Sequence, residues 1–193
     1  MNFLPTLENK RVMLQPLQAD HADVLLPIAL QPSLWEVGLN RISSRSDLER
    51  YIRIALTERN EQTCIPFVIY DKEQHRIAGS TRFSGITQVH KRCEIGHTWI
   101  DPVLQGSGLN KAIKYAMLQH AFEVMELNRI EFKTDELNMQ SRRAILSIGC
   151  TEEGILRHHM ITTTGRIRNT VYFSMLKEEW PDIKQRIFRK YDF

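Results

Sequence analysis

A short glycine-bearing stretch, placed between a strand-like and a helix-like segment, has the residue types of an anion-binding loop. Residues 94–100 before it are strand-like, and residues 109–126 after it contain neither proline nor glycine. The first N–H groups of a helix have no intrahelical partners, and the helix dipole adds roughly half a positive charge at that end. Glycine lets a phosphate approach the backbone without meeting a Cβ atom. The sequence therefore predicts a diphosphate site over Gln105-Gly106-Ser107-Gly108-Leu109-Asn110.

Two glycines before a helix also occur in plain turns, so the loop has a second, structural interpretation. No Gly-Lys-Ser/Thr sequence follows the glycines, which argues against a nucleoside triphosphatase. The third glycine of the dinucleotide-binding fingerprint is also missing, because Lys111 occupies its place. If the loop binds a phosphate, it does so through backbone N–H groups rather than through a lysine clamp.

A second stretch, over residues 129–157, adds a strand and a short helix with recognisable ends. Ile130, Phe132 and Thr134 alternate with polar residues, which is typical of a strand. Asn138 is a suitable N-cap for a helix over residues 139–148, and Gly149 suits the C′ position that ends it. The two stretches together form a pattern that neither forms alone.

This joint pattern resembles the GCN5-related N-acetyltransferase (GNAT) family, specifically its branch of ribosomal-protein N-terminal acetyltransferases. The family has a Gln/Arg-x-x-Gly-x-Gly/Ala loop, which Gln105 and Gly108 match and from which Asn110 departs in the last place. Asparagine tolerates left-handed backbone and caps helices, so we expect the loop to keep its shape. The resemblance covers residues 8–180, and its other matches are Asn138-x-x-Ser141-x-x-Ala144-x-x-x-x-Gly149 and residues 153–157 and 165–170.

The resemblance implies acetyl-CoA as co-substrate and suggests which residues would contact it. The pyrophosphate would lie on the loop of residues 105–110. Asn138 would hydrogen-bond an amide of the pantetheine arm, besides or instead of capping its helix. Ser141 matches the serine that faces the leaving thiolate, with a water-facing helix position as its alternative. Arg142 could meet the ribose 3′-phosphate or equally be solvated.

Acetyl transfer from a thioester to an amine needs a base for the amine, donors for the oxyanion and a partner for the leaving thiolate. If the two reactants are held in line, much of the rate gain comes from positioning, without a covalent enzyme intermediate. Glu94, in the strand before the loop, is the first candidate for the base; a structural ion pair with Arg82 or Lys91 is its alternative role. His97 faces the opposite side of a regular strand, and a β-bulge would reverse this.

An early pair of helices, with the loop between them, occupies the place where the resembled family shapes its acceptor pocket. We expect the first of these helices after Asp20 and the second from Ser46 or Asp47. Trp35, in the loop, is the candidate aromatic of the acceptor pocket. A buried packing role is the alternative for this tryptophan.

The hydrophobic patterns predict an α+β fold in which helices flank a mixed, mostly antiparallel central sheet of about six to seven strands. The resemblance adds that two splayed central strands hold the cofactor arm. We expect one domain over residues 1–193, with a core over residues 8–180 and a closing helix at 178–190. The other strands are expected at residues 7–17, 64–70, 76–83, 91–100, 153–161 and 168–176.

Composition narrows the classes of function. Of the 193 residues 42% are apolar and 25% charged, with a net charge of +3, as in an ordinary soluble globule without a basic arm for nucleic acid. No apolar run has the length of a membrane span, and the N-terminus does not begin a secretory signal. Cys64, Cys93 and Cys150 are odd in number and far apart, which suits a reducing cytoplasm. We therefore expect a cytoplasmic protein without a metal, a nucleic-acid partner or a membrane partner.

The leading hypothesis is an acetyl-CoA-dependent N-acetyltransferase. Its acceptor could be a protein N-terminus or a small amine such as a polyamine, an amino acid or an antibiotic, because likeness of fold does not select among them. The alternative from another class is a CoA-binding sensor or interaction module without turnover. A longer acyl donor such as succinyl-CoA would need an added cation near the acyl pocket, which the sequence does not locate. Apolar strands near the C-terminus are compatible with a homodimer.

Overall fold

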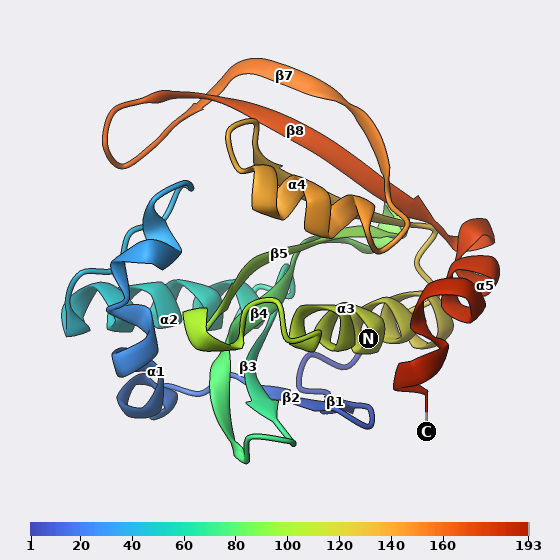
Figure 1. The fold of residues 1–193 in the computed structure, drawn as a ribbon, viewed down its shortest axis with the longest axis horizontal. Coiled ribbons are helices and arrows are strands. Elements are labelled where there is room, and N and C mark those ends of the chain that lie inside the picture. Colours follow the sequence, from blue (N-terminus) through green and yellow to red (C-terminus); the bar gives the residue numbers. More distant parts are fainter. Residues whose placement is uncertain (193) are drawn as a thin grey trace.

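One eight-stranded sheet, flanked by helices, forms the centre of the computed structural model, which describes residues 1–192 (Figure 1). The strand order is β1-β2-β3-β4-β5-β6-β8-β7, and only β5 and β6 run parallel. The predicted α+β class and mixed sheet are confirmed, with more strands than expected. The strands are β1 (Leu7–Glu8), β2 (Val12–Pro16), β3 (Ile65–Asp71), β4 (Arg76–Thr87), β5 (Arg92–Ile100), β6 (Arg129–Asp135), β7 (Thr151–Ile161) and β8 (Ile167–Leu176). The α-helices are α1 (His21–Ala29), α2 (Arg45–Asn60), α3 (Leu109–Gln119), α4 (Met139–Leu146) and α5 (Trp180–Ile183).

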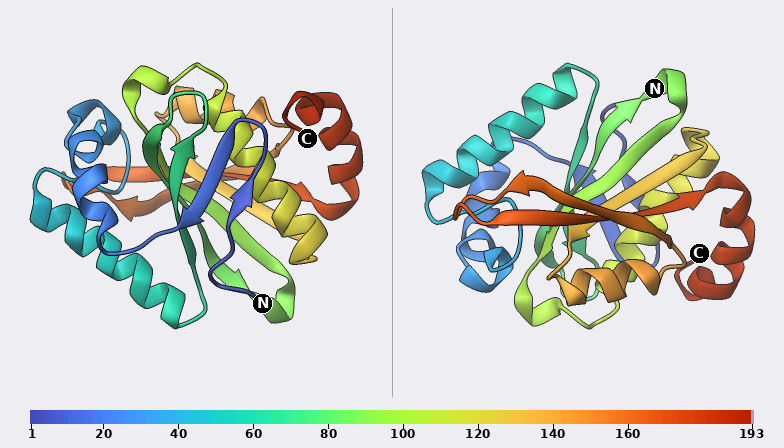
Figure 2. Two further views of the ribbon diagram at one scale, coloured as in Figure 1. Left: turned by 90° about the horizontal axis from the view of Figure 1, so that it is seen from below. Right: turned by 90° about the horizontal axis from the view of Figure 1, so that it is seen from above.

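Two groups of helices cover the two faces of the sheet (Figure 2). Helices α1 and α2 pack against Val68 and Trp99 on one face, which we call the α2 face. Helices α3, α4 and α5 pack against Phe67 and Phe132 on the other face, which we call the α3 face. The apolar residues at every fourth position from Leu109 form a stripe along α3 and the turn after it, and this stripe lies in the core. Its buried members are Leu109, Ile113, Met117 and Ala121.

The extra strand arises because residues 7–17 form a hairpin rather than the single strand we expected. Strands β1 and β2 pair antiparallel, and residue 9 begins the turn between them. The Asn9 Oδ1 atom accepts hydrogen bonds from the backbone N–H groups of Arg11 (2.9 Å) and Val12 (3.0 Å). Asparagine side chains stabilise turns in this way. The Asn9 Nδ2 atom also donates to the Ala112 carbonyl (2.8 Å), which fixes the turn against α3.

Several helix ends differ from the prediction. Helix α2 begins at Arg45, because the Ser44 side chain caps it by accepting a hydrogen bond from the Asp47 N–H. Asp20 precedes α1 but its side chain makes no capping bond. Helix α3 ends at Gln119 and continues as a π-helix over His120–Val124. The closing helix expected at 178–190 is broken into α5, a π-helical turn and 3₁₀ turns.

The parallel neighbours β5 and β6 separate along their length. Their pairing covers only residues 92–94 of β5 and residues 129–131 of β6. Beyond these residues β5 stays bonded to β4, and β6 stays bonded to β8. We call the space between residues 95–100 and residues 132–135 the wedge. The splayed central strands implied by the family resemblance are therefore present.

A β-bulge interrupts β5 beside the wedge. Arg82 of β4 lies opposite Gly96, and Ser80 lies opposite Trp99, so one residue of β4 faces two residues of β5. His97 is one of these two and has a left-handed φ of 51°. A bulge shifts the alternation of side chains by one residue. This shift decides which side chains of β5 share a face.

The sheet is strongly twisted, as sheets of L-residues are. Both views of Figure 2 show β7 and β8 crossing the direction of β3 and β4 at a steep angle. Strand β7 is the outer edge of the sheet, and all of its residues are exposed. In Figure 1 the β7–β8 hairpin arches over α4.

Two further features concern the expected environment of the protein. No helix within residues 1–192 combines the length and the apolar character that crossing a membrane requires. The cysteines Cys64, Cys93 and Cys150 are buried free thiols.

Candidate active site

The glycine loop connects β5 to α3 with two residues in left-handed conformation. Gly106 has a φ of 76° and Gly108, the N-cap residue of α3, has a φ of 90°. An added Cβ at Gly106 would meet no atom within 4 Å, so open space lies beside the loop. The Ser107 hydroxyl donates to the Leu104 carbonyl (2.7 Å) and tightens the turn. The predicted order of strand, glycine turn and helix start is confirmed.

Two loop residues have roles other than those the motif suggests. Leu109 is fully buried, so only its backbone can face a ligand. Asn110 lies inside α3 and is neither left-handed nor the cap, because Gly108 occupies the N-cap position. The expectation that Asn110 supplies left-handed backbone or a cap is wrong. The glycine two residues earlier makes both features without a steric penalty.

The start of α4 lies against the glycine loop. The Asn138 Oδ1 atom accepts a hydrogen bond from the Ser141 N–H (2.9 Å), which confirms the predicted N-cap. The Gln140 Nε2 atom donates to Gln105 Oε1 (3.0 Å) and so joins the segments that follow the two splayed strands. The loop, Asn138 and Ser141 are therefore at the same, open end of the wedge.

Arg142 is less free than we expected. One of its guanidinium nitrogens forms an ion pair with Glu152 of β7 at 3.2 Å, and another donates to the Glu136 carbonyl at 3.5 Å. Contact with a 3′-phosphate would require Arg142 to leave Glu152.

Glu94 is the last residue of β5 that pairs with β6, so it lies at the closed end of the wedge. Its Oε2 atom forms an ion pair with Lys133 of β6 at 3.0 Å, rather than with Arg82 or Lys91. A Cβ at Gly96 would lie 2.6 Å from Glu94 Oε1, so the absence of a side chain there gives the carboxylate room to lie along the strand. Because Ile95 belongs to the core of the α3 face, Glu94 faces the α2 face.

The bulge brings His97 to the α2 face, the side that Glu94 also faces. The His97 ring lies 6.4 Å from the ring of Tyr51 of α2, and the Tyr51 hydroxyl donates to the His97 carbonyl at 3.3 Å. A regular strand would have directed His97 to the other face. Although His97 is exposed on this face, the protein that lies around it and the charge of Arg82 lower its pKa, so its imidazole is neutral at pH 7.

Trp35 takes part in packing and also borders the α2 face. Its Nε1 atom donates to the Ala29 carbonyl at 2.7 Å, and its ring lies 5.9 Å from the ring of Trp99. The Trp99 Nε1 atom in turn donates to the Tyr51 hydroxyl at 3.3 Å. Tyr51 and Trp99 were not predicted as site residues from the sequence, because only the bulge directs Trp99 to this face.

Lys114 is a second residue that the sequence did not single out. It belongs to α3 and is 6% exposed. Its Nζ atom donates to the Thr98 hydroxyl of β5 at 2.6 Å and lies 5.8 Å from the ring centre of Phe132 of β6. A buried amine therefore lies between the splayed strands, on the α3 face.

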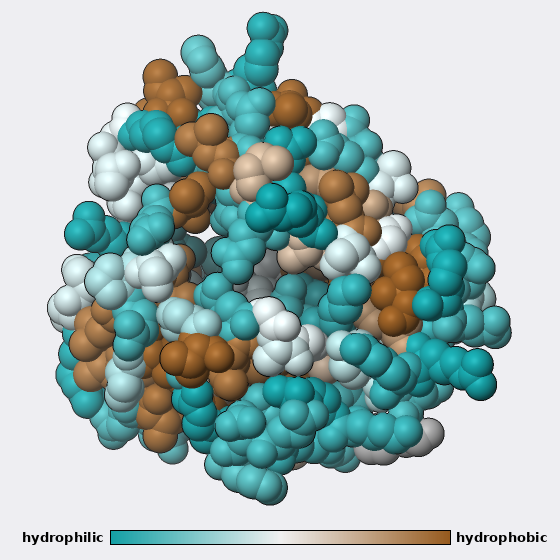
Figure 3. All heavy atoms as spheres, viewed as in Figure 1, coloured by the Kyte–Doolittle hydropathy of each residue, from teal (hydrophilic) through white to brown (hydrophobic). Residues whose placement is uncertain are grey.

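The surface is hollowed where these elements meet. Figure 3 shows a hollow near the centre of the molecule, and comparison with Figure 1 locates it beneath the β7–β8 hairpin, between the 3₁₀ turn Pro32–Trp35, α4 and the loop after β5. Polar and apolar side chains both border it. A ligand could enter the wedge from this side.

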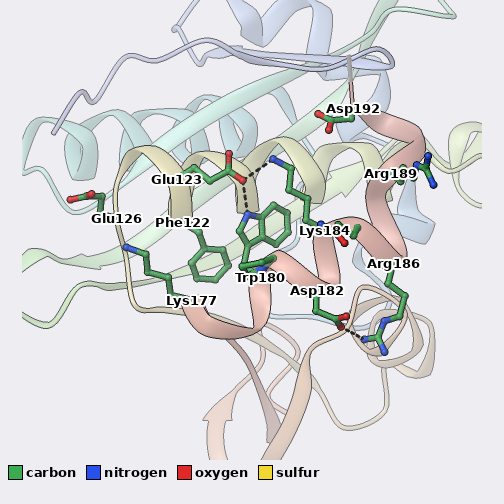
Figure 4. A pocket seen from close by; sticks show the side chains of 12 residues that line it. Phe122, Glu123, Glu126, Lys177, Trp180, Asp182, Lys184, Arg186, Arg189 and Asp192 are labelled. Atoms are coloured by element: carbon green, nitrogen blue, oxygen red, sulfur yellow. Dashed lines mark hydrogen bonds and ion pairs between the residues drawn. The ribbon is translucent and has the colours of Figure 1, made fainter.

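A second hollow lies elsewhere, between the end of α3 and the C-terminal segment (Figure 4). Several of its polar groups bond to one another across the hollow. The Glu123 carboxylate accepts hydrogen bonds from Trp180 Nε1 (2.7 Å) and Lys184 Nζ (2.9 Å). These contacts fasten the C-terminal segment to the core, and the site chemistry described above lies apart from them. Within residues 1–192, no group of three or more His, Cys, Asp or Glu side chains could hold a metal ion.

Comparisons with known proteins agree with this geometry. The acetyltransferase (GNAT) domain family matches residues 11–151. The Bacillus subtilis (strain 168) protein named "Putative ribosomal N-acetyltransferase YdaF" is 34% identical over 104 residues, which cover 54% of this chain and 56% of that protein. A crystal structure of a GCN5-related N-acetyltransferase from Brucella melitensis has a TM-score of 0.86 at 27% identity and covers 94% of this chain and 82% of that one.

A further solved structure shares the fold at lower identity. Mycobacterium smegmatis RimJ, in complex with CoA-disulfide, has a TM-score of 0.77 at 22% identity over 92% of this chain and 88% of that one. Together with the splayed strands, the bulge and the glycine loop, the matches show that this chain belongs to the GNAT family of N-acetyltransferases.

Proposed function

We propose that this acetyltransferase moves the acetyl group of acetyl-CoA directly to a primary amine, in a complex that holds both substrates at once. The amine is a protein N-terminus or a small amine. The observation that carries the proposal is the wedge, with the glycine loop at its open end and the Glu94 carboxylate at its closed end. Such an arrangement supports a route in which the thioester enters from one end and the amine approaches from the α2 face.

The loop and the wedge supply what the cofactor needs. The N–H groups at the start of α3 would bind the diphosphate. Residues 95–100 of β5 have no strand partner on the wedge side, so backbone groups on that side could pair with the two amides of the pantetheine arm. Asn138 would add a hydrogen bond from the other side. RimJ, which shares the fold, is described in complex with CoA-disulfide, and this supports the assignment.

Glu94 would accept the proton that the amine loses. Its carboxylate faces the side from which the amine approaches, and Lys133 holds it there at 3.0 Å. The neutral His97, brought to the same face by the bulge, is the second candidate, with water as the third. The backbone of β5 at the bulge would donate to the thioester oxygen as negative charge develops on it.

Ser141 would donate a hydrogen bond to the departing thiolate. We predict that Ser141→Ala lowers kcat by about tenfold, because a lost hydrogen bond to a charged group costs about 1.5 kcal/mol. Affinity for acetyl-CoA should stay within about twofold. Steady-state kinetics with calorimetry would test both. Ser147→Ala, at the C-cap of the same helix, is the matched control, because the Ser147 hydroxyl donates to the Ala144 carbonyl. If the two variants had equal kcat, Ser141 would have no role in the reaction.

Trp35 would present its ring to the acceptor, because its N–H group is already used by Ala29. We predict that Trp35→Leu raises KM for the acceptor several-fold and leaves KM for acetyl-CoA unchanged. Initial rates with each substrate varied in turn would measure this. An equal change in both values would assign Trp35 to packing alone.

The acceptor class can be tested with a panel assay. The purified protein and acetyl-CoA would be mixed with peptides bearing free N-termini, polyamines, amino acids and aminoglycosides, and release of the CoA thiol would be followed. We expect one class to accelerate release far above the rate in water. If no amine accelerated release while acetyl-CoA still bound, turnover would be refuted and a CoA-binding module would remain.

A further inference from the structure

Lys114 is a buried amine at the wedge to which the reaction described above gives no task. It extends from α3 to the Thr98 hydroxyl (2.6 Å), next to the bulge. Thr98 in turn is 2.7 Å from the Thr81 hydroxyl. The ring of Phe132 closes the other side. The amine is thus held between the two strands that separate to form the wedge.

The surroundings of Lys114 do not neutralise a positive charge. Among residues 1–192 no carboxylate forms an ion pair with it, and an ammonium group has three N–H donors to satisfy. The titratable groups that act on it are Cys150, just before β7, and Glu94 on β5. Burial outweighs their effect and lowers the pKa of Lys114 to about 7. Both protonation states are therefore accessible near neutral pH.

The reaction needs a group that gives up a proton on the cofactor side. When the C–S bond breaks, the electron pair stays on sulfur, and the thiolate takes up a proton to become CoA-SH. A serine hydroxyl such as that of Ser141 can hydrogen-bond the thiolate but does not ionise at neutral pH. An alkyl thiol has a pKa of about 8.5, so an ammonium that is a stronger acid than this gives its proton to the thiolate downhill.

We propose that Lys114 is the proton donor to the CoA thiolate, with Ser141 supplying a hydrogen bond beside it. This inference rests on the proposed function. The amine nitrogen forms a bond to the acetyl carbon and loses its proton to Glu94, and the C–S bond breaks. The sulfur then takes a proton from the Lys114 ammonium. Afterwards Glu94 returns its proton to solvent and Lys114 regains one, so the net change is one proton moved from nitrogen to sulfur.

The test compares Lys114→Met with wild type at saturating acetyl-CoA over pH 6 to 9. Methionine is of similar length and keeps the site filled. Because Lys114 must be protonated to act, kcat of the wild type should fall as pH rises through about 7. In Lys114→Met, kcat should be about a hundredfold lower at pH 6.5 and this fall should be gone. The exposed Lys177→Met is the matched control and should behave like wild type.

Three results would overturn the inference. Lys114→Met could keep the wild-type kcat, or it could keep the fall in rate above pH 7. It could also transfer acetyl normally while losing transfer from succinyl-CoA, which would make Lys114 an anchor for an acyl carboxylate. If wild type transferred acetyl to no amine, the proposed function itself would fail, so the two failures are distinct.

A stability measurement checks the buried charge without any turnover. Since burial depresses the pKa of Lys114 in the folded state, the unfolded chain binds one more proton between about pH 7 and the ordinary lysine pKa of about 10.4. The contribution of Lys114 to the free energy of unfolding of the wild type therefore rises with pH over that window. Lys114→Met should have the higher Tm at pH 6, and its advantage should shrink by pH 9. If Lys114→Met had the same Tm advantage over wild type at every pH, the claim that burial disfavours the charged form of Lys114 would be contradicted.

Discussion

Glu94→Gln should lower kcat for acetyl transfer by about a hundredfold to a thousandfold, because a positioned general base contributes on that order. The amide keeps the shape of the side chain, and Gly96 leaves room for it. It cannot accept the proton that the amine must lose. Affinity for acetyl-CoA should stay within about twofold, since Glu94 lies on the α2 face and the cofactor arm would lie in the wedge. Steady-state rates and calorimetry on the same preparation would measure both quantities.

The control for this prediction is Lys133→Met. It breaks the same 3.0 Å ion pair but leaves the carboxylate in place. If Glu94 acts as the base, Glu94→Gln should be at least tenfold slower than Lys133→Met. Equal rates would mean that only the ion pair matters, and His97 or water would then be the base.

Gly108→Val should weaken acetyl-CoA binding at least tenfold. A residue with a Cβ pays roughly 1–2 kcal/mol in left-handed backbone, and Gly108 has a φ of 90°. The new Cβ would also lie 3.3 Å from the Tyr191 hydroxyl, which already donates to the Gly108 carbonyl at 3.1 Å. The valine methyl groups would lie where a diphosphate would approach the N-terminus of α3. A loss of about 1.4 kcal/mol in binding corresponds to tenfold.

Gly165→Val is the control that separates the effect of backbone strain on stability from the effect of Gly108→Val on acetyl-CoA binding. Gly165 has a φ of 81° and open space around its Cβ position, in the turn between β7 and β8. Both variants should lower Tm in the absence of ligand, and only Gly108→Val should weaken acetyl-CoA binding in calorimetry. Unchanged affinity in Gly108→Val would remove the loop from the cofactor site.

Local sequence signals predicted the glycine loop and the start of α4 well. The glycines at 106 and 108, the N-cap Asn138 and the apolar stripe of α3 each depend on residues within one or two turns of chain. Such signals act on the backbone directly, through allowed φ values, unpaired N–H groups and helical periodicity. The structure agrees with them except at Asn110, where the glycine at the N-cap made its expected role unnecessary.

The contacts of Glu94, His97 and Trp99 could not be predicted from local sequence, because they depend on elements that are distant in the chain. Lys133 meets Glu94 only because of the parallel register of β5 and β6. The bulge directs His97 and Trp99 to the α2 face. The sequence of β5 contains no signal for this bulge, because its residues otherwise alternate as in a regular strand. These features follow from tertiary structure rather than from local pattern.

Lys114 illustrates the same limit on a helix. It lies beside the apolar stripe, where a lysine is normally solvated. The C-terminal segment covers the outer side of α3, and the ring of Tyr115 stacks on Phe188 at 5.5 Å and on Tyr191 at 6.4 Å. With the outer side covered and the wedge on the inner side, every residue from 112 to 118 is buried. The periodicity of the helix sequence alone does not predict that both sides of the helix are covered.

The central claim, that the wedge and glycine loop hold acetyl-CoA, is tested most directly by thermal shift. The purified protein would be titrated with acetyl-CoA, CoA and NAD side by side. Ligand at about a hundred times its dissociation constant adds about 2.7 kcal/mol, which raises Tm by roughly 5–10 °C in a domain of this size. We expect a rise of this order with acetyl-CoA and CoA and none with NAD. No rise with either CoA species would contradict the account and leave a GNAT fold without its cofactor.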